Sequence, residues 1–311
     1  TLELARIFSD AGLPDGVFNV VPGAGEVAGQ ALVEHPDVSK VAFTGSTPVG
    51  KRIMETASHN LKRVSLELGG KAPNIVFDDV EIDNCIEACL RGGFFNQGEN
   101  CTAVTRLLLH ENIYDEFLPR YLERVKAIRV GDPMEESTEM GALISKEHLE
   151  TVEGYFKTGI KEGGAVLAGG KRPTDQKLRN GYFFLPTVVG DVRPDHTIAC
   201  EEIFGPIVAV MSFKTEEEVV RIANDTIYGL AGGIWTNDVK RAFRVAKAVR
   251  AGYIWINTYG GIIPDTPYGG FKQSGIGKEL GGEGLDNYLE TKCINIYLGD
   301  KLPRFYGGEQ Q

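Results

Sequence analysis

Residues 63–77 have the sequence Arg-Val-Ser-Leu-Glu-Leu-Gly-Gly-Lys-Ala-Pro-Asn-Ile-Val-Phe, in which two apolar runs flank a pair of glycines. The runs at 63–66 and 74–77 are short and are bounded by turn-forming residues, which predicts two strands. Glu67 follows the first strand directly. A carboxyl group at the end of a strand in an α/β sheet points toward the ligand crevice. Glu67 is therefore a candidate functional residue, with a plain surface charge as the alternative.

The alternation of strand and helix patterns continues over most of the chain, which is typical of the α/β class. Further strands are expected at 18–21, 40–43, 106–109, 183–189, 207–213 and 253–256. Helices are expected at 25–34, 48–57, 81–96, 112–128, 145–163, 215–224 and 237–248. Residues 292–298 alternate Cys, Asn and Tyr with Ile, Ile and Leu, which predicts a half-buried strand near the C-terminus.

The composition is that of an ordinary globular protein, with 42% hydrophobic and 24% charged residues among 311. That length corresponds to about two domains. The formal net charge of −10 repels phosphate backbones, so a nucleic-acid partner would need a local basic patch. The one candidate is interpreted as a solvated helix face, and no nucleic-acid partner is expected; it comprises Lys240, Arg241, Arg244, Lys247 and Arg250.

No apolar run approaches the ~20 residues of a membrane-spanning helix, so no membrane association is expected. The five cysteines are odd in number and irregularly spaced, which argues against a disulfide framework and favours a reducing, cytoplasmic location. Cys85 and Cys89 share a helix face, but no His pair stands at ligand spacing. They are interpreted as buried small residues, and no metal site is expected.

Two glycine-containing stretches each follow a predicted strand and open a predicted helix. The stretch 23–29, which contains Gly25 and Gly29, resembles a dinucleotide-binding loop with one residue too many before the last glycine, so a tight turn is an equal alternative. Gly45 and Ser46 precede Pro48, at a helix start where N–H groups attract phosphate. A simple Ser/Thr helix cap is the alternative there.

Cys101 follows a predicted helix and a loop that contains Gly98. A cysteine in that place is exposed enough to act as a nucleophile if its thiolate is stabilised, and a buried small residue is the alternative. In the sequence Glu-Glu-Ile-Phe-Gly-Pro at 201–206, Glu202 stands close to Phe204. A carboxylate can bind ribose hydroxyls while an aromatic ring holds another ring.

Taken in order, four motifs resemble the NAD(P)-dependent aldehyde dehydrogenase superfamily from residue 1 to about residue 299: L-E-L-G-G-K at 66–71, G-x-x-C at 98–101, E-E-I-F-G-P at 201–206 and P-Y-G-G-F-K-Q-S-G at 267–275. The separation of 34 positions between Glu67 and Cys101 also matches that family's spacing of base and nucleophile. The resemblance implies an α/β, aldehyde-dehydrogenase-like fold with a partial Rossmann-type nucleotide-binding domain, an α/β catalytic domain and a C-terminal oligomerisation strand. The implied boundaries are 1–68 for the C-terminal part of the NAD(P)-binding domain, 69–269 for the catalytic thiol domain, 270–290 for a return segment that packs on the nucleotide domain, and 291–311 for the oligomerisation strand and tail.

The resemblance also implies roles for individual residues. Cys101 would be the nucleophile, with its backbone N–H as half of an oxyanion hole, and Glu67 would activate the hydrolytic water. The cofactor NAD or NADP would contact Gly45 and Ser46 at its pyrophosphate, Gly25 and Gly29 near its adenine, Glu202 and Phe204 near its nicotinamide ribose, and the Leu68 backbone at its carboxamide. Ile262 and Tyr268 match positions that line the aldehyde tunnel.

Members of the family carry an N-terminal section that this sequence lacks. That section holds a P-W-N-F-P motif, whose Asn is the second oxyanion donor, and a K-P-x-E motif, whose Lys holds the adenine ribose. The chain does not begin with Met, and its first residues have the pattern of the middle of an amphipathic helix. A fragment, a truncated product or half of a split gene is therefore expected, with a separate chain that supplies the missing section as a candidate partner.

The tail strand implies a homo-oligomer, a dimer or a tetramer, because in relatives it joins the sheet of a neighbouring subunit. A further departure is Glu99, where many relatives have Gln. A carboxylate two residues from Cys101 would disfavour the thiolate if it points inward, and facing solvent is the alternative.

The implied activity is NAD(P)-dependent oxidation of a small-molecule aldehyde to its acid through a cysteine thiohemiacetal and thioester. Three alternatives stay open. In a CoA-acylating enzyme CoA would take the acyl group, although Glu67 favours water as the acceptor. A fragment with little dehydrogenase activity of its own would have a binding or assembly role. Cys101 and Glu67 could also hydrolyse activated esters without NAD.

Overall fold

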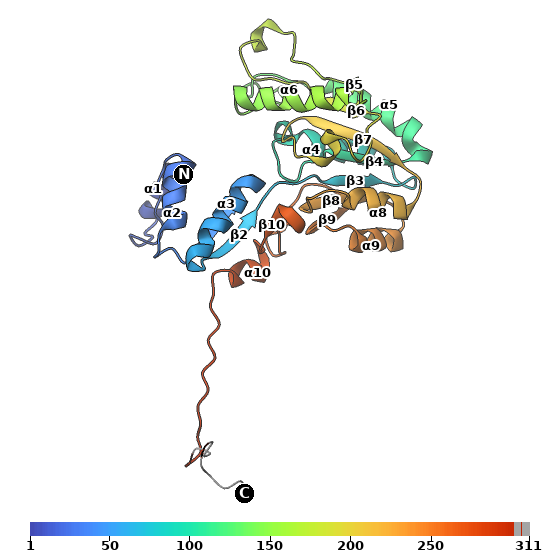
Figure 1. The fold of residues 1–311 in the computed structure, drawn as a ribbon. Coiled ribbons are helices and arrows are strands. Elements are labelled where there is room, and N and C mark those ends of the chain that lie inside the picture. The colour runs from blue at the N-terminus through green and yellow to red at the C-terminus, as the bar shows by residue number, and fades with distance from the viewer. Residues whose placement is uncertain (302–305, 307–311) are drawn as a thin grey trace.

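The strands form two sheets in the computed structural model, which describes residues 1–301 and residue 306. The smaller sheet has the order β1-β2-β10 and the larger sheet the order β5-β6-β7-β4-β3-β8-β9 (Figure 1). The strands span β1 Lys40–Thr44, β2 Arg63–Glu67, β3 Pro73–Val76, β4 Arg106–His110, β5 Ala165–Ala168, β6 Thr187–Gly190, β7 Ile207–Phe213, β8 Ala231–Trp235, β9 Tyr253–Ile256 and β10 Gly275–Ile276. In the larger sheet β5 pairs antiparallel with β6, and the other pairs are parallel. The predicted α/β class is confirmed.

Helices connect these strands, as expected for parallel pairs. They span α1 Leu2–Asp10, α2 Gln30–Glu34, α3 Thr47–Ala57, α4 Ile82–Phe94, α5 Glu111–Ala127, α6 Lys146–Lys161, α7 Thr197–Cys200, α8 Glu216–Asn224, α9 Val239–Ala248 and α10 Gly281–Asp286, and a π-helical turn at Gly25–Gly29 precedes α2. None of the helices in the described residues combines the length and the apolar composition that crossing a bilayer requires.

The central strands of the larger sheet are apolar on both faces, because alternate residues belong to two different hydrophobic cores. On β4, Leu107 and Leu109 lie in the core that contains the buried residues of α4 and α5. Leu108, between them, lies in the core that contains the buried residues of α6, α8 and α9. Cys85 and Cys89 are fully buried in the first of these cores, as the sequence predicted.

The smaller sheet is completed by a segment from the far end of the sequence. β2 pairs in parallel with β1, and antiparallel with β10, which places Gly275 opposite Glu67. From β2 the chain passes through residues 68–72 into β3 of the larger sheet. The carboxyl end of β2 therefore meets the amino ends of β3, β4 and β7. The domain boundaries expected at 68, 269 and 290 stay a prediction.

Several predicted strands differ from the structure. Residues 18–21 form no strand, because Phe18 packs edge-on against Phe8 with ring centroids 5.1 Å apart and no neighbouring segment in the described residues pairs with them. The strand expected at 183–189 begins only at Thr187. The strands β5 and β8 were not predicted, and in β8 the glycines 232 and 233 weaken the strand pattern.

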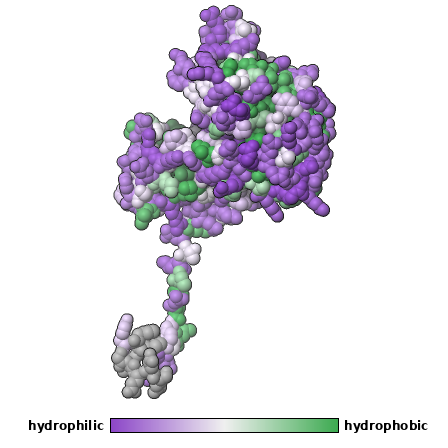
Figure 2. Space-filling model, turned by 45° about the vertical axis from the view of Figure 1, so that its right-hand side comes forward, coloured by the Kyte–Doolittle hydropathy of each residue, from purple (hydrophilic) through white to green (hydrophobic). Residues whose placement is uncertain are grey.

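The tail is not a strand in the single chain. Residues 291–298 form no regular structure and are exposed, with Ile294 and Ile296 each 75% accessible and Leu298 90% accessible. They lead away from the body of the molecule, and Figure 2 shows apolar groups along that extension. The half-buried strand predicted at 292–298 is therefore wrong for the isolated chain, in which no strand of residues 1–301 lies beside this segment. The last part of the predicted tail, residues 302–305 and 307–311, lies outside the described residues.

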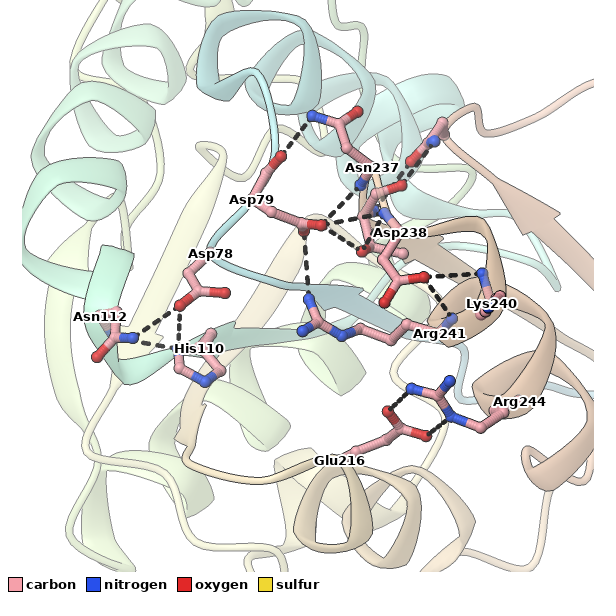
Figure 3. Close-up of polar contacts among 12 residues, drawn as sticks. Asp78, Asp79, His110, Asn112, Glu216, Asn237, Asp238, Lys240, Arg241 and Arg244 are labelled. Atoms are coloured by element: carbon pink, nitrogen blue, oxygen red, sulfur yellow. Dashed lines mark hydrogen bonds and ion pairs between the residues drawn. The ribbon is translucent and has the colours of Figure 1, made fainter.

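Two basic residues of α9, Arg241 and Arg244, are bound to acidic partners near the carboxyl edge of the larger sheet (Figure 3). Arg241 lies 3.5 Å from Asp79 and stacks its guanidinium over the ring of Phe77. Arg244 forms a two-pronged ion pair with Glu216 on α8, with N–O distances of 3.0 and 2.9 Å. The segment is a helix face, and two of its five basic residues are neutralised by acidic side chains, whereas the absence of a nucleic-acid partner stays a prediction.

One buried cation fastens the start of β4. The Arg106 guanidinium is fully buried and donates to the carbonyls of Lys71, Ile222 and Ala223 at 3.0, 2.9 and 2.9 Å. Burial lowers the pKa of Arg106 to about 10, which still leaves it charged at neutral pH. The last two carbonyls end α8, where a cation is favoured by the helix dipole.

We expect Arg106→Met to lower the free energy of unfolding by about 3 kcal/mol, because three buried carbonyls lose their donor. Arg193, on the surface and paired with Asp195, provides the control. Arg193→Met is expected to cost less than about 0.5 kcal/mol. Urea unfolding of both variants measures the difference, and equal effects would show that Arg106 does not fasten this edge.

Candidate functional site

Cys101 lies in the loop between α4 and β4, at the wall of a cavity of about 290 Å³. The loop turns sharply because Asn96 and Gln97 adopt left-handed backbone angles, with φ of 51° and 58°. Ile262 and Tyr268, both predicted from the sequence, line the same cavity. The full lining is Arg91, Gly92, Phe95, Asn100, Cys101, Thr102, Trp255, Tyr259, Gly260, Ile262 and Tyr268.

The thiol of Cys101 is partly buried and lies 3.9 Å from the hydroxyl oxygen of Tyr268. Burial raises the pKa of the Cys101 thiol, the contact with Tyr268 opposes that rise, and the carboxylates of Glu202 and Glu67 add to it. The thiol therefore resists ionisation, mainly because burial disfavours its charged form and secondarily because of the two carboxylates.

Glu67 ends β2 as a buried carboxyl group. Burial raises the pKa of Glu67 to about 7, with a further rise from Glu279 and an opposing effect of Lys278. No hydrogen-bond partner among the described residues reaches its Oε2 atom. Glu67 does not line the cavity of Cys101, but its charge acts on the thiol. A buried carboxyl group that titrates near neutral pH is suited to take up a proton from a reacting water.

The glycine pair after Glu67 packs against both other parts of the site. A Cβ atom on Gly69 would lie 2.1 Å from Oε2 of Glu202, and one on Gly70 would lie 2.3 Å from the carbonyl oxygen of Cys101. The N–H of Gly70 donates to Oε1 of Glu202 at 3.0 Å. Burial raises the pKa of Glu202, and this hydrogen bond opposes the rise, as does Lys71. The structure thus brings Glu67, Glu202 and Cys101 together around residues 69 and 70.

The predicted phosphate-binding residues lie on the smaller sheet and its helices. Gly45 ends the β1 segment with its N–H bonded to the carbonyl of Glu67 at 3.0 Å, and Ser46 precedes α3 without making a side-chain cap. The first turn of α3 therefore keeps its backbone donors for a ligand. Gly25 and Gly29 lie in the turn before α2, which packs on α3, and each has open space where a Cβ would stand.

Two further predicted residues lie between these groups. Leu68 is buried, and its N–H donates to the carbonyl of Ser274 at 2.9 Å, so only its carbonyl oxygen is left to face a ligand. Phe204 has a left-handed φ of 54°, and the residue is 38% exposed. The carbonyl of Phe204 accepts a hydrogen bond from His148 at 2.6 Å.

Glu99 takes neither of the two orientations considered from the sequence. Its Oε1 atom accepts from the N–H of Ile144 at 3.0 Å and lies 3.5 Å from Nε2 of His148. The carboxylate therefore fastens the Cys101 loop to the start of α6.

Some residues of the site were not found by sequence reasoning. Arg91, Phe95 and Trp255 line the cavity, but they stand outside the four motifs. Lys71 is buried with no partner for its Nζ among the described residues, and burial lowers its pKa to about 7. Lys71 is the last residue of the motif L-E-L-G-G-K. Its place between two glycines and an apolar run could have indicated that its side chain is buried. Within the described residues, no cluster of three or more His, Cys, Asp and Glu side chains could hold a metal ion.

The raised pKa of Glu67 makes stability depend on pH. In the unfolded chain the carboxyl group ionises near pH 4.5, whereas in the folded protein it ionises near 7. Between these values the unfolded state releases its proton first, so stability falls as pH rises and stays low above about 7. We expect Glu67→Gln to stabilise the protein by on the order of 1–3 kcal/mol more at about pH 8 than at about pH 5. Chemical unfolding at both pH values tests this, with Glu136→Gln, at an exposed carboxylate, as the control that shows no such difference.

Comparison with known proteins agrees with this geometry. The pattern of the aldehyde dehydrogenase family matches residues 1–294. The chain is 48% identical over 299 residues to 4-trimethylaminobutyraldehyde dehydrogenase A of Danio rerio, covering 96% of this chain and 59% of that protein. It is 47% identical over 305 residues to betaine aldehyde dehydrogenase 1 of Oryza sativa subsp. japonica, covering 98% and 60%.

Among solved structures, betaine aldehyde dehydrogenase from Staphylococcus aureus in complex with NAD+ superposes with a TM-score of 0.93 and 40% identity, over 97% of this chain and 61% of that one. The chain thus spans about 60% of the length of the relatives it matches. The family pattern runs through nearly the whole described chain, and the fold is that of a solved member. The chain belongs to the aldehyde dehydrogenase family.

Proposed function

We propose that the protein oxidises an aldehyde to its carboxylic acid, with NAD+ as the hydride acceptor and Cys101 as the nucleophile. The observation that carries this proposal is a thiol at the wall of a cavity beside a buried carboxyl group with a pKa of about 7. A nucleophile and a base with such a pKa are the two groups that acyl transfer to water requires.

The residues around the site fit a dinucleotide. The uncapped start of α3 after Gly45 and Ser46 suits a pyrophosphate, and the turn at Gly25–Gly29 lies on the neighbouring helix. The Oε2 atom of Glu202 is left to accept from ribose hydroxyls, because Oε1 already accepts from Gly70. When bound, the nicotinamide accepts a hydride. We favour NAD+ over NADP+ because the S. aureus relative was solved with NAD+.

Cys101 forms the covalent bond to the substrate. Its thiolate attacks the aldehyde carbon and gives a thiohemiacetal, whose oxygen faces the backbone N–H of Cys101; no carbonyl among the described residues takes that donor. Loss of a hydride converts the adduct to a thioester on the same sulfur. Tyr268 assists the first step, since its hydroxyl contact lowers the pKa of the thiol.

Glu67 completes the reaction. It takes a proton from water as the oxygen attacks the thioester carbon, and the carbon–sulfur bond breaks to release the acid and the thiol. Only ionised Glu67 can do this, so hydrolysis speeds up as the pH rises through about 7. A base at this position favours water over CoA as the acceptor.

The proposal is tested with the purified chain, a panel of aldehydes and NAD+. NADH formation that is lost in Cys101→Ala, by at least about 10³-fold, is the expected result for a covalent nucleophile. Cys293→Ala, which removes an exposed thiol in the tail, should keep its activity. NADH formation that persists in Cys101→Ala would contradict the assignment. Ester hydrolysis without NADH formation, lost in the same variant, would replace the proposal with the esterase alternative.

We also propose that the tail pairs with a second copy of the chain. Strand β9 is the edge of the larger sheet, and a groove of about 600 Å³ runs along it, lined by residues that include Tyr253, Ile254 and Ile256. An exposed segment with alternating Ile, Ile and Leu can extend such an edge. Strand β1 is likewise an edge of the smaller sheet, and a strand from a separate chain could pair with it. The separate chain that would supply the missing N-terminal section stays a prediction.

Removal of residues 290–311 should shift the chain from an oligomer to a monomer, because the added strand is lost. Light scattering measures the mass before and after the deletion. A double Ile294→Lys/Ile296→Lys variant keeps the full length and is expected to give the same shift. An unchanged oligomer in both variants would exclude the tail as the interface.

A further inference from the structure

One charged side chain stands in the wall of the Cys101 cavity. Among the lining residues that the structure describes, only Arg91 carries a formal charge; the others are neutral, and several are aromatic. Arg91 lies on α4, and its Nε atom is 3.7 Å from the point that a Cβ on Gly260 would occupy. The side chain therefore extends from α4 to Gly260, and the two residues together form part of the cavity wall.

The guanidinium of Arg91 has no internal partner in residues 1–301. Two acidic residues, Glu87 and Glu139, line a second cavity of about 400 Å³, which Arg91 and Phe95 share with the first. Glu87, one helical turn before Arg91, binds Arg124 at 2.5 Å, and Glu139 binds Arg129 at 3.1 Å. Both carboxylates are thus committed to other arginines, and Arg91 keeps five donors for a ligand.

The cavity lining contains two kinds of group that would favour different aldehyde tails, namely aromatic rings and the guanidinium of Arg91. Aromatic rings such as Trp255 and Tyr259, with centroids 4.6 Å apart, attract cations weakly through their faces. A guanidinium repels a cation and binds a carboxylate through two parallel hydrogen bonds, and its full charge acts over a longer range. With no acid in the lining to neutralise Arg91, its charge decides the preference.

We propose that Arg91 makes this protein selective for aldehydes that carry a carboxylate at the end remote from the carbonyl, and that it disfavours trimethylammonium aldehydes of the kind for which the two sequence relatives are named. This inference rests on the proposed function for its substrate, but the electrostatic role of Arg91 is separable from it. The carbonyl would meet Cys101, and the carboxylate would meet Arg91.

The first experiment needs neither cofactor nor turnover. Cys101 is treated with two methanethiosulfonate reagents that differ in the tail, one with an ethylsulfonate and one with an ethyltrimethylammonium group. The thiolate attacks the thiosulfonate sulfur, a mixed disulfide forms and methanesulfinate leaves, so no oxidant is consumed. Peptide mass mapping follows Cys101 apart from the other four cysteines, and the rates are divided by those of a free thiol.

In Arg91→Gln the ratio of anionic to cationic rates should fall about tenfold, because the charge of Arg91, although the residue is exposed, stands in the lining of the cavity that receives the tail. Arg91→Lys should keep most of the ratio. Arg120→Gln removes the same charge from α5, outside both cavities, and should leave the ratio within about twofold because surface charges are screened. A ratio in Arg91→Gln that equals that of the unmodified chain overturns the proposal.

The second experiment uses turnover with 4-oxobutanoate, butanal and 4-trimethylaminobutanal, which share a chain length and differ in the tail. The unmodified chain should have its highest kcat/KM with 4-oxobutanoate, and Arg91→Gln should lower the ratio of 4-oxobutanoate to butanal by about 10–100-fold. A higher kcat/KM for the trimethylammonium aldehyde would overturn the selectivity. If no aldehyde yields NADH, the proposed function fails for this chain, and the thiol ratio still decides the role of Arg91.

Discussion

The chain passes from one sheet to the other through two glycines that have no room for a side chain. Gly69 lies against the carboxylate of Glu202 and Gly70 lies against the carbonyl of Cys101, each closer than a Cβ atom would allow. Ser274 holds this passage in place, since its hydroxyl donates to the carbonyl of Gly69 at 2.6 Å and its carbonyl accepts from Leu68. Because Glu67 comes two residues before Gly69, the positions of Glu67, Glu202 and Cys101 all depend on these two close contacts.

Burial around the glycine pair also sets the order of the chemistry. The pKa values of Glu67, Glu202 and Cys101 are all raised, mainly by burial, and the two carboxylates further oppose ionisation of the thiol. The thiolate of Cys101 forms most readily while Glu67 is protonated. In the proposed reaction an acylated sulfur carries no charge, and Glu67, whose pKa is about 7, is then free to ionise and act as a base.

The sequence predicted the parts of the fold whose signal is local. The apolar runs of β4 and β7 are continuous, those of β2 and β3 are short and bounded by turn-forming residues, and Glu67 and Cys101 stand at motif positions whose order carried the family resemblance. The strand β8 was missed because its glycines make a weak strand pattern, yet Gly233 is required there: a Cβ would lie 2.3 Å from the side chain of Asn74. That requirement comes from a strand more than 150 residues away in the sequence.

Other features could not be predicted because they depend on contacts with segments that are distant in the sequence or belong to another chain. Residues 18–21 have a strand composition without a strand partner, and the tail at 292–298 has the right alternation but no sheet in its own chain. Arg91 has an ordinary place on a helix, and only the folded chain brings it to the wall that contains Cys101. Local pattern therefore pointed to the proposed reacting groups, Cys101 and Glu67, whereas the residues that surround them could be found only from the structure.

The proposed roles of Cys101 as nucleophile and Glu67 as base are tested most directly by the lifetime of the acyl-enzyme. An activated ester supplies the acyl group without cofactor, and intact-protein and peptide mass spectrometry locate it. The account predicts that Glu67→Gln accumulates one acyl group per chain on Cys101, which persists while the unmodified chain releases it faster as the pH rises through about 7. An acyl group on another residue, or equal lifetimes in the two proteins, would contradict it.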